Sequence, residues 1–360
     1  RMPGVVTLHQ NSETQSKPSY FKGQCWGALT LGIGTFLNPF ALPLKLEMHQ
    51  GFTHLGEDAA EDALSLTQQM VMMAIQFALC VNRPTLLVLD AYFSVGPVFL
   101  MANSVWLISL KGPAVEIIVR AKKNYVAYLQ ADPSDYKGIG RPSKYGEEIH
   151  LMEIFDHLHL FETVSARIYG KVEEIYLTQM NLMWKPTKGL ISFVFALTSH
   201  GPIVLMCSNL NQDPLAAIEL YCLRVRIEVM FEMLKHLIRG FYCHFWSKKM
   251  PRHSRKPRKN SELMSPNDND IQTVQSCWNA TERFVNLGGI ALGLLQLISL
   301  QFSKNIWNSF VGYLRTFSRD IPSERTTKSV ISNLLITDFL KVAPTATMRT
   351  IRKIILKGQF

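Results

Sequence analysis

The chain has 360 residues, 47% of them hydrophobic and 18% charged, so it can bury a substantial core and is not a disordered polypeptide. Its formal net charge of +10 at pH 7 favours a polyanionic partner. Six cysteines show neither a C-x-x-C pair nor a zinc-type spacing, which indicates small buried hydrophobes and favours the cytosol.

The first predicted elements are two strands, at 25–33 and 36–48, that form a hairpin, and two prolines interrupt the second strand. A helix follows, with apolar residues at helical spacing between 64 and 79. Asp58 and Asp62 lie in its opening G-E-D-A-A-E-D-A, where acids favour the helix dipole. These two carboxylates are therefore predicted to be solvated.

The stretch 84–92 reads P-T-L-L-V-L-D-A-Y, an apolar run that ends in Asp90 and precedes a predicted helix at 95–106. A continuous apolar run is typical of a strand buried on both faces. Because ligands of α/β sheets bind beyond the carboxyl ends of strands, Asp90 is a candidate site residue. The next predicted strand, 115–119, is followed by Arg120 and two lysines.

A β-rich region is predicted for residues 149–210, after a Pro/Gly-rich stretch at 132–146. Its first part alternates with a period near two, a G-K pair marks a turn, and a second strand run is broken at S-H-G-P. Trp184 is its most conspicuous aromatic residue and is predicted to be buried.

One regular helix of roughly seven turns is predicted from 213 to 240. Asp213 is its predicted N-cap, Pro214 occupies the first turn, and Gly240 is the predicted C-cap. The tripeptide H-F-W at 244–246 closes this helix and is predicted to pack in the core.

Within this helix, residues 221–235 fit the spacing Y-x2-R-x3-E-x6-K. At about 100° per residue, Tyr221, Arg224, Glu228 and Lys235 lie within roughly 60° of one another. A carboxylate in such a line can hold a divalent metal, while the flanking cations and the phenol bind neighbouring phosphates. The alternative is an amphipathic helix with solvated charges.

A basic stretch at 248–259, K-K-M-P-R-H-S-R-K-P-R-K, contains two prolines and is predicted to be a flexible linker. Its candidate phosphate-binding residues are Lys248, Lys249, Arg252, Arg255 and Lys256, with a solvated linker as the alternative. The apolar run 284–302 is long enough to cross a membrane, but polar residues recur on one side, which favours a buried core helix.

The strand-end acid followed by the Y-x2-R-x3-E-x6-K helix resembles the signature of a large group of bacterial insertion-sequence transposases of the DDE superfamily. The resemblance implies an α/β (α+β) fold with an RNase H-like core, a β-rich insertion between the second and third acids, and a helical C-terminal region. It divides the chain into core (1–125), β-rich insertion (126–212), a core helix carrying the catalytic Glu (213–246), basic linker (247–270) and helical region (271–360).

The resemblance also implies the chemistry, which is DNA cleavage and strand transfer by two-metal phosphoryl transfer. Asp90 and Glu228 are the implied catalytic acids and ligands of Mg²⁺, for which Mn²⁺ can substitute. Tyr221, Arg224 and Lys235 are the implied residues that bind the cleaved DNA end. The implied partners are double-stranded DNA, as transposon ends and target, and a second copy of the chain, in the bacterial cytoplasm at the nucleoid and away from the membrane.

The first acid of that family lies on a central strand before the hairpin, but no Asp precedes Asp58 in this chain. The expectation is therefore an N-terminally truncated chain that is inactive by itself, with Asp58 and Asp62 as weak substitutes. Two alternatives remain open, a non-catalytic DNA-binding remnant of a transposase and a nuclease on the same fold.

Overall fold

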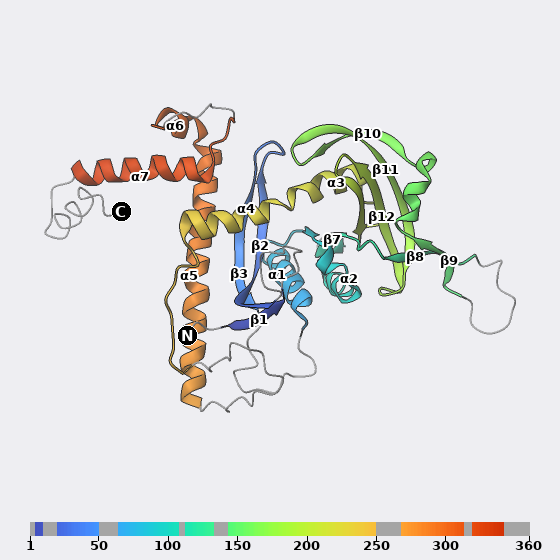
Figure 1. Cartoon of the computed structure of the whole chain (residues 1–360), viewed down its shortest axis with the longest axis horizontal. Coiled ribbons are helices and arrows are strands. Elements are labelled where there is room, and N and C mark those ends of the chain that lie inside the picture. Colours follow the sequence, from blue (N-terminus) through green and yellow to red (C-terminus); the bar gives the residue numbers. More distant parts are fainter. Residues whose placement is uncertain are drawn as a thin grey trace.

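The fold combines a three-stranded sheet, a larger mixed sheet and two groups of helices (Figure 1). The computed structural model describes residues 4–9, 20–49, 64–107, 112–132, 143–249, 268–312 and 319–341. The predicted mixture of helices and strands is confirmed.

The predicted hairpin is confirmed and forms an antiparallel sheet of β1 (Val5–His9), β2 (Tyr20–Gly34) and β3 (Pro39–His49), in that order. Its register shifts between Leu29 and Thr30, which pair with Lys45 and Pro43. Proline has no N–H group for the ladder and is tolerated at such irregular positions. The bulge therefore accommodates the proline that interrupts the second strand.

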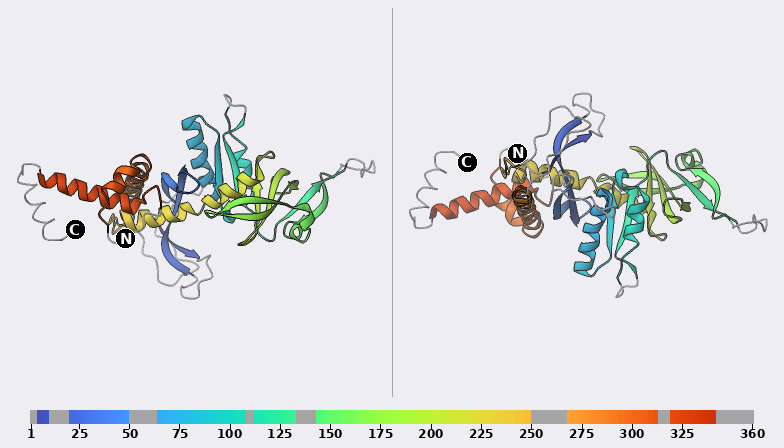
Figure 2. Two further views of the ribbon diagram at one scale, coloured as in Figure 1. Left: turned by 90° about the horizontal axis from the view of Figure 1, so that it is seen from above. Right: turned by 90° about the horizontal axis from the view of Figure 1, so that it is seen from below.

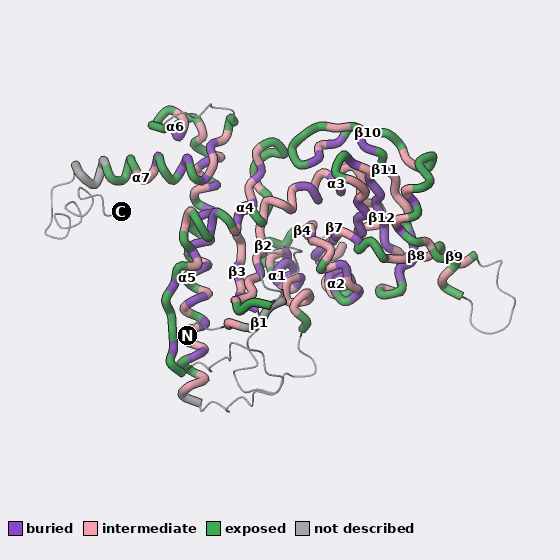
Figure 3. The backbone as a smooth tube through the Cα atoms, viewed as in Figure 1, coloured by how far each residue is buried: buried purple, intermediate pink, exposed green. Residues whose placement is uncertain are grey.

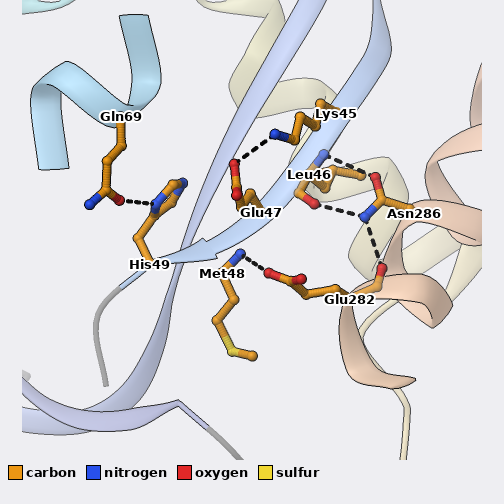
Figure 4. Close-up of polar contacts among 8 residues, drawn as sticks. All are labelled: Lys45, Leu46, Glu47, Met48, His49, Gln69, Glu282 and Asn286. Carbon is orange, nitrogen blue, oxygen red and sulfur yellow. Dashed lines mark hydrogen bonds and ion pairs between the residues drawn. The ribbon is translucent and has the colours of Figure 1, made fainter. Parts of the chain in front are cut away.

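The outer edge of β3 is covered by side chains of α5 (Asp268–Gln301), as Figure 4 shows. The Met48 N–H donates to Glu282 Oε1 at 2.8 Å, and the Leu46 N–H donates to Asn286 Oδ1 at 3.0 Å. Asn286 Nδ2 in turn donates to the Leu46 carbonyl at 2.7 Å. These bonds occupy the backbone groups that would otherwise pair with a further strand.

The larger sheet has eight strands, in the order β4-β7-β13-β12-β11-β8-β9, with β10 also paired to β11. Its strands are β4 (Thr85–Leu89), β7 (Val115–Arg120), β8 (Val126–Gln130), β9 (Tyr145–His150), β10 (Glu162–Ile168), β11 (Lys171–Trp184), β12 (Gly189–Thr198) and β13 (Gly201–Cys207). β4 and β7 are parallel, and the remaining neighbours are antiparallel. A small separate pair consists of β5 (Trp106–Leu107) and β6 (Gly112–Pro113).

Helices cover both faces of the larger sheet near β4 and β7. One core cluster joins Ile117 and Val119 to α1 (Leu66–Val81) and α2 (Gly96–Ala102), and another joins Ile118 to α3 (Pro214–Leu223). Successive side chains of β7 therefore enter opposite cores, as expected for a strand that is buried on both faces. The helix predicted at 95–106 is correspondingly shorter, because the chain turns into β5.

The predicted β-rich region is confirmed, including the turn at Tyr169 and Gly170 between β10 and β11. Its first part differs from the prediction, because two 3-10 turns, Glu153–Asp156 and Leu158–Leu160, lie there in place of strand. Its last strand, β13, pairs with β7, so these strands continue the sheet that begins with β4.

The long helix α5 is buried on one face only, which corrects the prediction of a buried core helix at 284–302 (Figure 3). Its opposite face exposes a stripe of apolar side chains, Phe284, Leu287, Ile290, Leu294 and Leu297. Among the described residues, its segment Asp270–Gln301 alone has the length and hydropathy to cross a membrane, a test that core helices also pass.

Within the described residues, two further helices follow α5. They are α6 (Ser303–Asn308) and α7 (Glu324–Lys341). Both views in Figure 2 place α7 at one end of the molecule, far from β9. The helical region predicted for the end of the chain is thus present as far as residue 341.

Candidate functional site

The helix that carries the Y-x2-R-x3-E-x6-K spacing is interrupted, which corrects the prediction of one regular helix. After α3 come α4 (Arg226–Glu232) and a π-helical segment (Met233–Ile238). At the junction, the N–H groups of Arg224 and Ile227 donate to carbonyls three residues back, at 3.0 and 3.1 Å. This tighter hydrogen bonding separates α3 from α4.

The predicted start of this helix is confirmed, and its predicted end is displaced by one residue. Asp213 Oδ2 accepts from the Ala216 N–H at 2.8 Å, which is an N-cap bond. At the other end, Arg239 has the left-handed conformation with φ of 60°, and the Gly240 N–H donates to the Leu234 carbonyl at 2.8 Å. The left-handed position thus falls on Arg239 instead of Gly240.

Asp90 lies directly after β4, as the sequence predicts. Its Oδ1 accepts from the Tyr92 N–H at 2.9 Å and caps a 3-10 turn at Ala91–Phe93. Its Oδ2 faces Arg224, whose Nη1 is 3.9 Å away. One carboxylate oxygen therefore has a local structural partner, and the other is directed to the helix junction.

The guanidinium of Arg224 joins the two predicted catalytic acids. Its Nη2 donates to Glu228 Oε1 at 2.9 Å, while its Nη1 lies 3.9 Å from Asp90 Oδ2. The side chain of Arg224 is 26% exposed, against 44% for Asp90 and 61% for Glu228. The structure thus brings two acids from distant parts of the sequence to one solvent-accessible cation.

Tyr221 is only 5% exposed and packs in the core cluster under α3, so its predicted place on an exposed line of polar groups is wrong. Burial raises the pKa of its phenol, and the neighbouring Arg224 and Arg120 oppose this shift. Asp90 raises the pKa further, which shows that the phenol lies within electrostatic reach of the acid. The phenol, the two arginines and Asp90 form one polar cluster.

Arg120 is the member of this cluster that the sequence patterns did not assign. It ends β7, and the parallel register that pairs Leu89 with Val119 sets it beside Asp90. Because parallel strands end at the same edge of a sheet, the basic residue after the second apolar run was the available signal.

The remaining predicted basic residues do not join this cluster through any described contact. Lys235 and Lys248 are exposed, and Lys249 Nζ forms an ion pair with Asp270 Oδ1 at 2.7 Å. Arg252, Arg255 and Lys256 lie outside the described residues, as do Asp58 and Asp62.

The aromatic predictions have opposite outcomes. Trp184 is 4% exposed and packs edge-on against Phe99, so its predicted burial is confirmed. Phe245 and Trp246 are 38% and 63% exposed, so the predicted core packing of H-F-W is wrong. The helix ends before this tripeptide, which leaves its side chains on the surface.

Asp90 and Glu228 are chemically suitable metal ligands. Carboxylate oxygens are what Mg²⁺ prefers, and Mg²⁺ is often held by one or two carboxylates together with substrate phosphates. No group of three or more His, Cys, Asp or Glu side chains that could hold a metal occurs within the described part of the chain. The two acids are thus of the right chemical type for Mg²⁺, while Arg224 occupies the space between them in this structure.

The chain was compared with known protein families and proteins. No protein-family model matches it, and no curated protein sequence matches it.

Proposed function

We propose that the chain is a DDE-type transposase polypeptide, which acts on double-stranded DNA at the site formed by Asp90, Arg224 and Glu228. The observation that carries the proposal is the single guanidinium between two carboxylates, one from a strand end and one from a helix. This spacing of tyrosine, arginine and acid matches the transposase signature, and the fold brings the acid after β4 to it.

The arrangement around the site supports an RNase H-like core. A hairpin and α1 precede β4, a parallel strand follows, and helices lie on both sides of this part of the sheet. The acid after β4 and the acid on the later helix then converge at the carboxyl edge of the parallel strands.

Each residue of the cluster has a chemical role in this proposal. Asp90 and Glu228 would hold Mg²⁺, or Mn²⁺ in its place, and a bound ion would activate a nucleophile and neutralise phosphate charge. Arg224 and Arg120 would bind phosphate oxygens, since planar guanidinium groups suit them. The ring of Tyr221 is buried, so Tyr221 would not contact DNA itself. Its phenol would position Arg120 through a side-chain hydrogen bond.

A second candidate function is metal-independent DNA binding by a chain of transposase descent. It is favoured by the pair of acids at the site, because two-metal transfer uses a larger ligand set. A nuclease on the same fold is the third candidate, and it would hydrolyse DNA without joining strands. The three candidates share DNA binding and differ in metal binding and products.

The first test is binding of the 360-residue protein to duplex DNA, measured by fluorescence anisotropy at low and at physiological salt. A transposase polypeptide with net charge +10 is expected to bind, and affinity is expected to fall steeply as salt rises. Absence of binding at low salt would refute all three candidates.

The second test locates the metal without requiring turnover. Fe²⁺ replaces Mg²⁺ at carboxylate sites, and with ascorbate and peroxide it is expected to cut the polypeptide near residues 90 and 228. Asp90→Asn and Glu228→Gln should remove these cuts, and Glu232→Gln, one turn along α4 and also exposed, should preserve them. Cuts that survive Glu228→Gln would contradict the assignment of the metal to this acid, and absence of cuts in the unaltered protein would leave metal-independent DNA binding as the favoured function.

A further inference from the structure

A second polar site lies on the other side of α4, away from Asp90. A cavity of about 200 Å³ opens where the β2–β3 turn, α4, α5 and the start of α7 meet. It is smaller than the roughly 300–1,000 Å³ typical of pockets for drug-sized ligands. A ligand that fits this cavity would therefore be a small chemical group.

Three arginines line this cavity. Arg226 is half-buried at the start of α4. Arg319 lies before α7, and Arg325 lies in the first turn of α7. No ion pair joins any of them to a carboxylate among the described residues. Burial lowers the pKa of Arg226 and the nearby Arg319 lowers it further, while Glu324 opposes the shift. Guanidinium groups that share a cavity repel one another unless an anion lies between them.

A buried amide, Gln296, and a buried carboxylate, Glu324, line the same space. Gln296 of α5 is 1% exposed and lines the cavity. Its Nε2 donates to the Ala41 carbonyl at 3.2 Å and to Glu324 Oε1 at 3.0 Å, which fixes the orientation of the amide. Its Oε1 has no hydrogen-bond partner, and a buried acceptor without a donor is unusual in folded proteins.

The first turn of α7 adds to the positive potential. This 18-residue helix begins at Glu324, and Ser323 caps it by accepting from the Thr326 N–H at 3.3 Å. The N-terminus of a helix carries partial positive charge and favours anions. Glu324 is nevertheless present and 6% exposed, so the cavity combines cations with a buried carboxylate.

We propose that this cavity binds a phosphate group that still carries a P–OH proton, as in inorganic phosphate or a phosphate monoester. The arginines match its anionic oxygens. The Glu324 carboxylate matches a P–OH donor, which sulfate and phosphodiesters lack near neutral pH. The proposal does not depend on the function proposed for the Asp90 site, because binding of phosphate by itself would establish it.

The test is calorimetric titration of the 360-residue protein at pH 6.0, close to the second pKa of about 6 of a phosphate monoester. Inorganic phosphate is expected to bind at least tenfold more tightly than sulfate. Arg226→Gln should weaken phosphate binding by roughly tenfold, and so should Arg319→Gln, whose side chain is exposed. A hydrogen bond to a charged group contributes a binding free energy that corresponds to about a tenfold change in affinity. Arg283→Gln, an exposed arginine of α5 outside the cavity, should leave binding unchanged.

The carboxylate is tested by Glu324→Gln, which keeps the shape of the side chain and adds a donor. The preference for phosphate over sulfate should then shrink to less than threefold. Equal affinity for the two anions in the unaltered protein would overturn the proposal. It would also be overturned if phosphate binding survived both Arg226→Gln and Arg319→Gln.

Two DNA oligonucleotides of one sequence distinguish the sources of the phosphate. If a 5′-phosphorylated strand binds more tightly than its 5′-hydroxyl counterpart, and Arg319→Gln removes the difference, the ligand is a DNA end. If both strands bind equally while inorganic phosphate still binds, the cavity takes a free phosphate ester. Both outcomes support the cavity as a phosphate site, whether or not the protein processes DNA.

Discussion

Asn286 binds both polar groups of residue Leu46 with one side-chain amide. Its Oδ1 accepts from the Leu46 N–H at 3.0 Å, and its Nδ2 donates to the Leu46 carbonyl at 2.7 Å (Figure 4). The amide thus imitates the hydrogen-bonding pattern of a neighbouring β-strand. A helix is attached to a sheet edge by this contact across 240 residues of sequence.

The substitution Asn286→Ala is expected to destabilise the protein by roughly 2 kcal/mol or more, because it leaves two backbone groups of β3 without partners. Chemical denaturation monitored by circular dichroism measures the change in free energy of unfolding. Asn279→Ala on the same helix is the matched control, since Asn279 is exposed and bonds only to Gln275 in the described contacts. Equal losses for the two variants would show that the Leu46 contact is not important for stability.

Arg224 is expected to compete with a metal for the two acids. Replacing Arg224 by Gln removes the cation between Asp90 and Glu228, so Mn²⁺ should bind more tightly than to the unaltered protein. Stability should change by less than about 1 kcal/mol, because these ion pairs are solvent-accessible. Electron paramagnetic resonance of free Mn²⁺ measures the affinity, and weaker binding in the variant would contradict this view of the site.

The basic stretch 248–259 is expected to contribute to DNA binding by neutralising phosphate groups. Replacing its basic residues by Gln should make the slope of log affinity against log salt less steep, in proportion to the number of phosphates that are no longer neutralised. Lys248→Gln should weaken binding more than Lys249→Gln, because Lys249 is paired with Asp270. An unchanged salt slope after neutralisation of the whole stretch would identify it as a solvated linker.

Residues 1–360 by themselves are expected neither to cleave nor to join DNA with Mg²⁺ or Mn²⁺, because Asp90 and Glu228 supply only part of the ligand set of two-metal transfer. Incubation with labelled duplexes followed by denaturing electrophoresis tests this. Metal-dependent cleavage would direct attention to Asp58 and Asp62 as further ligands. A Glu228→Gln variant that lost such cleavage, beside an active Glu232→Gln, would still support the assignment of the helix acid.

The buried thiols are expected to resist modification at alkaline pH. Burial raises the pKa of Cys207 to about 12, so this thiol stays protonated at pH 9, whereas Cys80 is exposed to the reagent. Because the folded-state pKa lies above the unfolded value, Cys207 stabilises the fold below about pH 9 and loses that contribution as pH rises towards 12. Mass spectrometry after a brief alkylation at pH 9 should find Cys80 modified and Cys207 intact.

Local patterns in the sequence predicted much of the fold. The apolar run before Asp90 predicted the strand β4, although only its last residue, Leu89, is fully buried, because β4 lies at the edge of the sheet. The N-cap at Asp213 predicted the start of α3. Both signals depend on adjacent residues. The pairing of β13 with β7 was not predictable in this way, since hydrophobic alternation does not specify which strand lies next to which.

The sequence predicted the two acids and Arg224 of the site, but it did not assign Arg120. Regular helical geometry assigned Tyr221 to an exposed line, but the i to i−3 bonds after it change the phase of the helix. Arg226, two positions after Arg224, lies roughly 200° around the helix from it and lines the cavity instead of the site at Asp90. A periodic pattern carries no signal for a local change in hydrogen bonding such as the one after Tyr221.

The short junction between α3 and α4 limits how this part of the chain can change in length. Each residue turns a helix by about 100°, so deleting one residue between Arg224 and Glu228 would rotate the acid away from its arginine. The same deletion would also alter the placement of Arg226 relative to Arg319 in the cavity. Related chains are therefore expected to tolerate substitutions here far better than insertions or deletions, and to keep the number of residues from 221 to 228 constant.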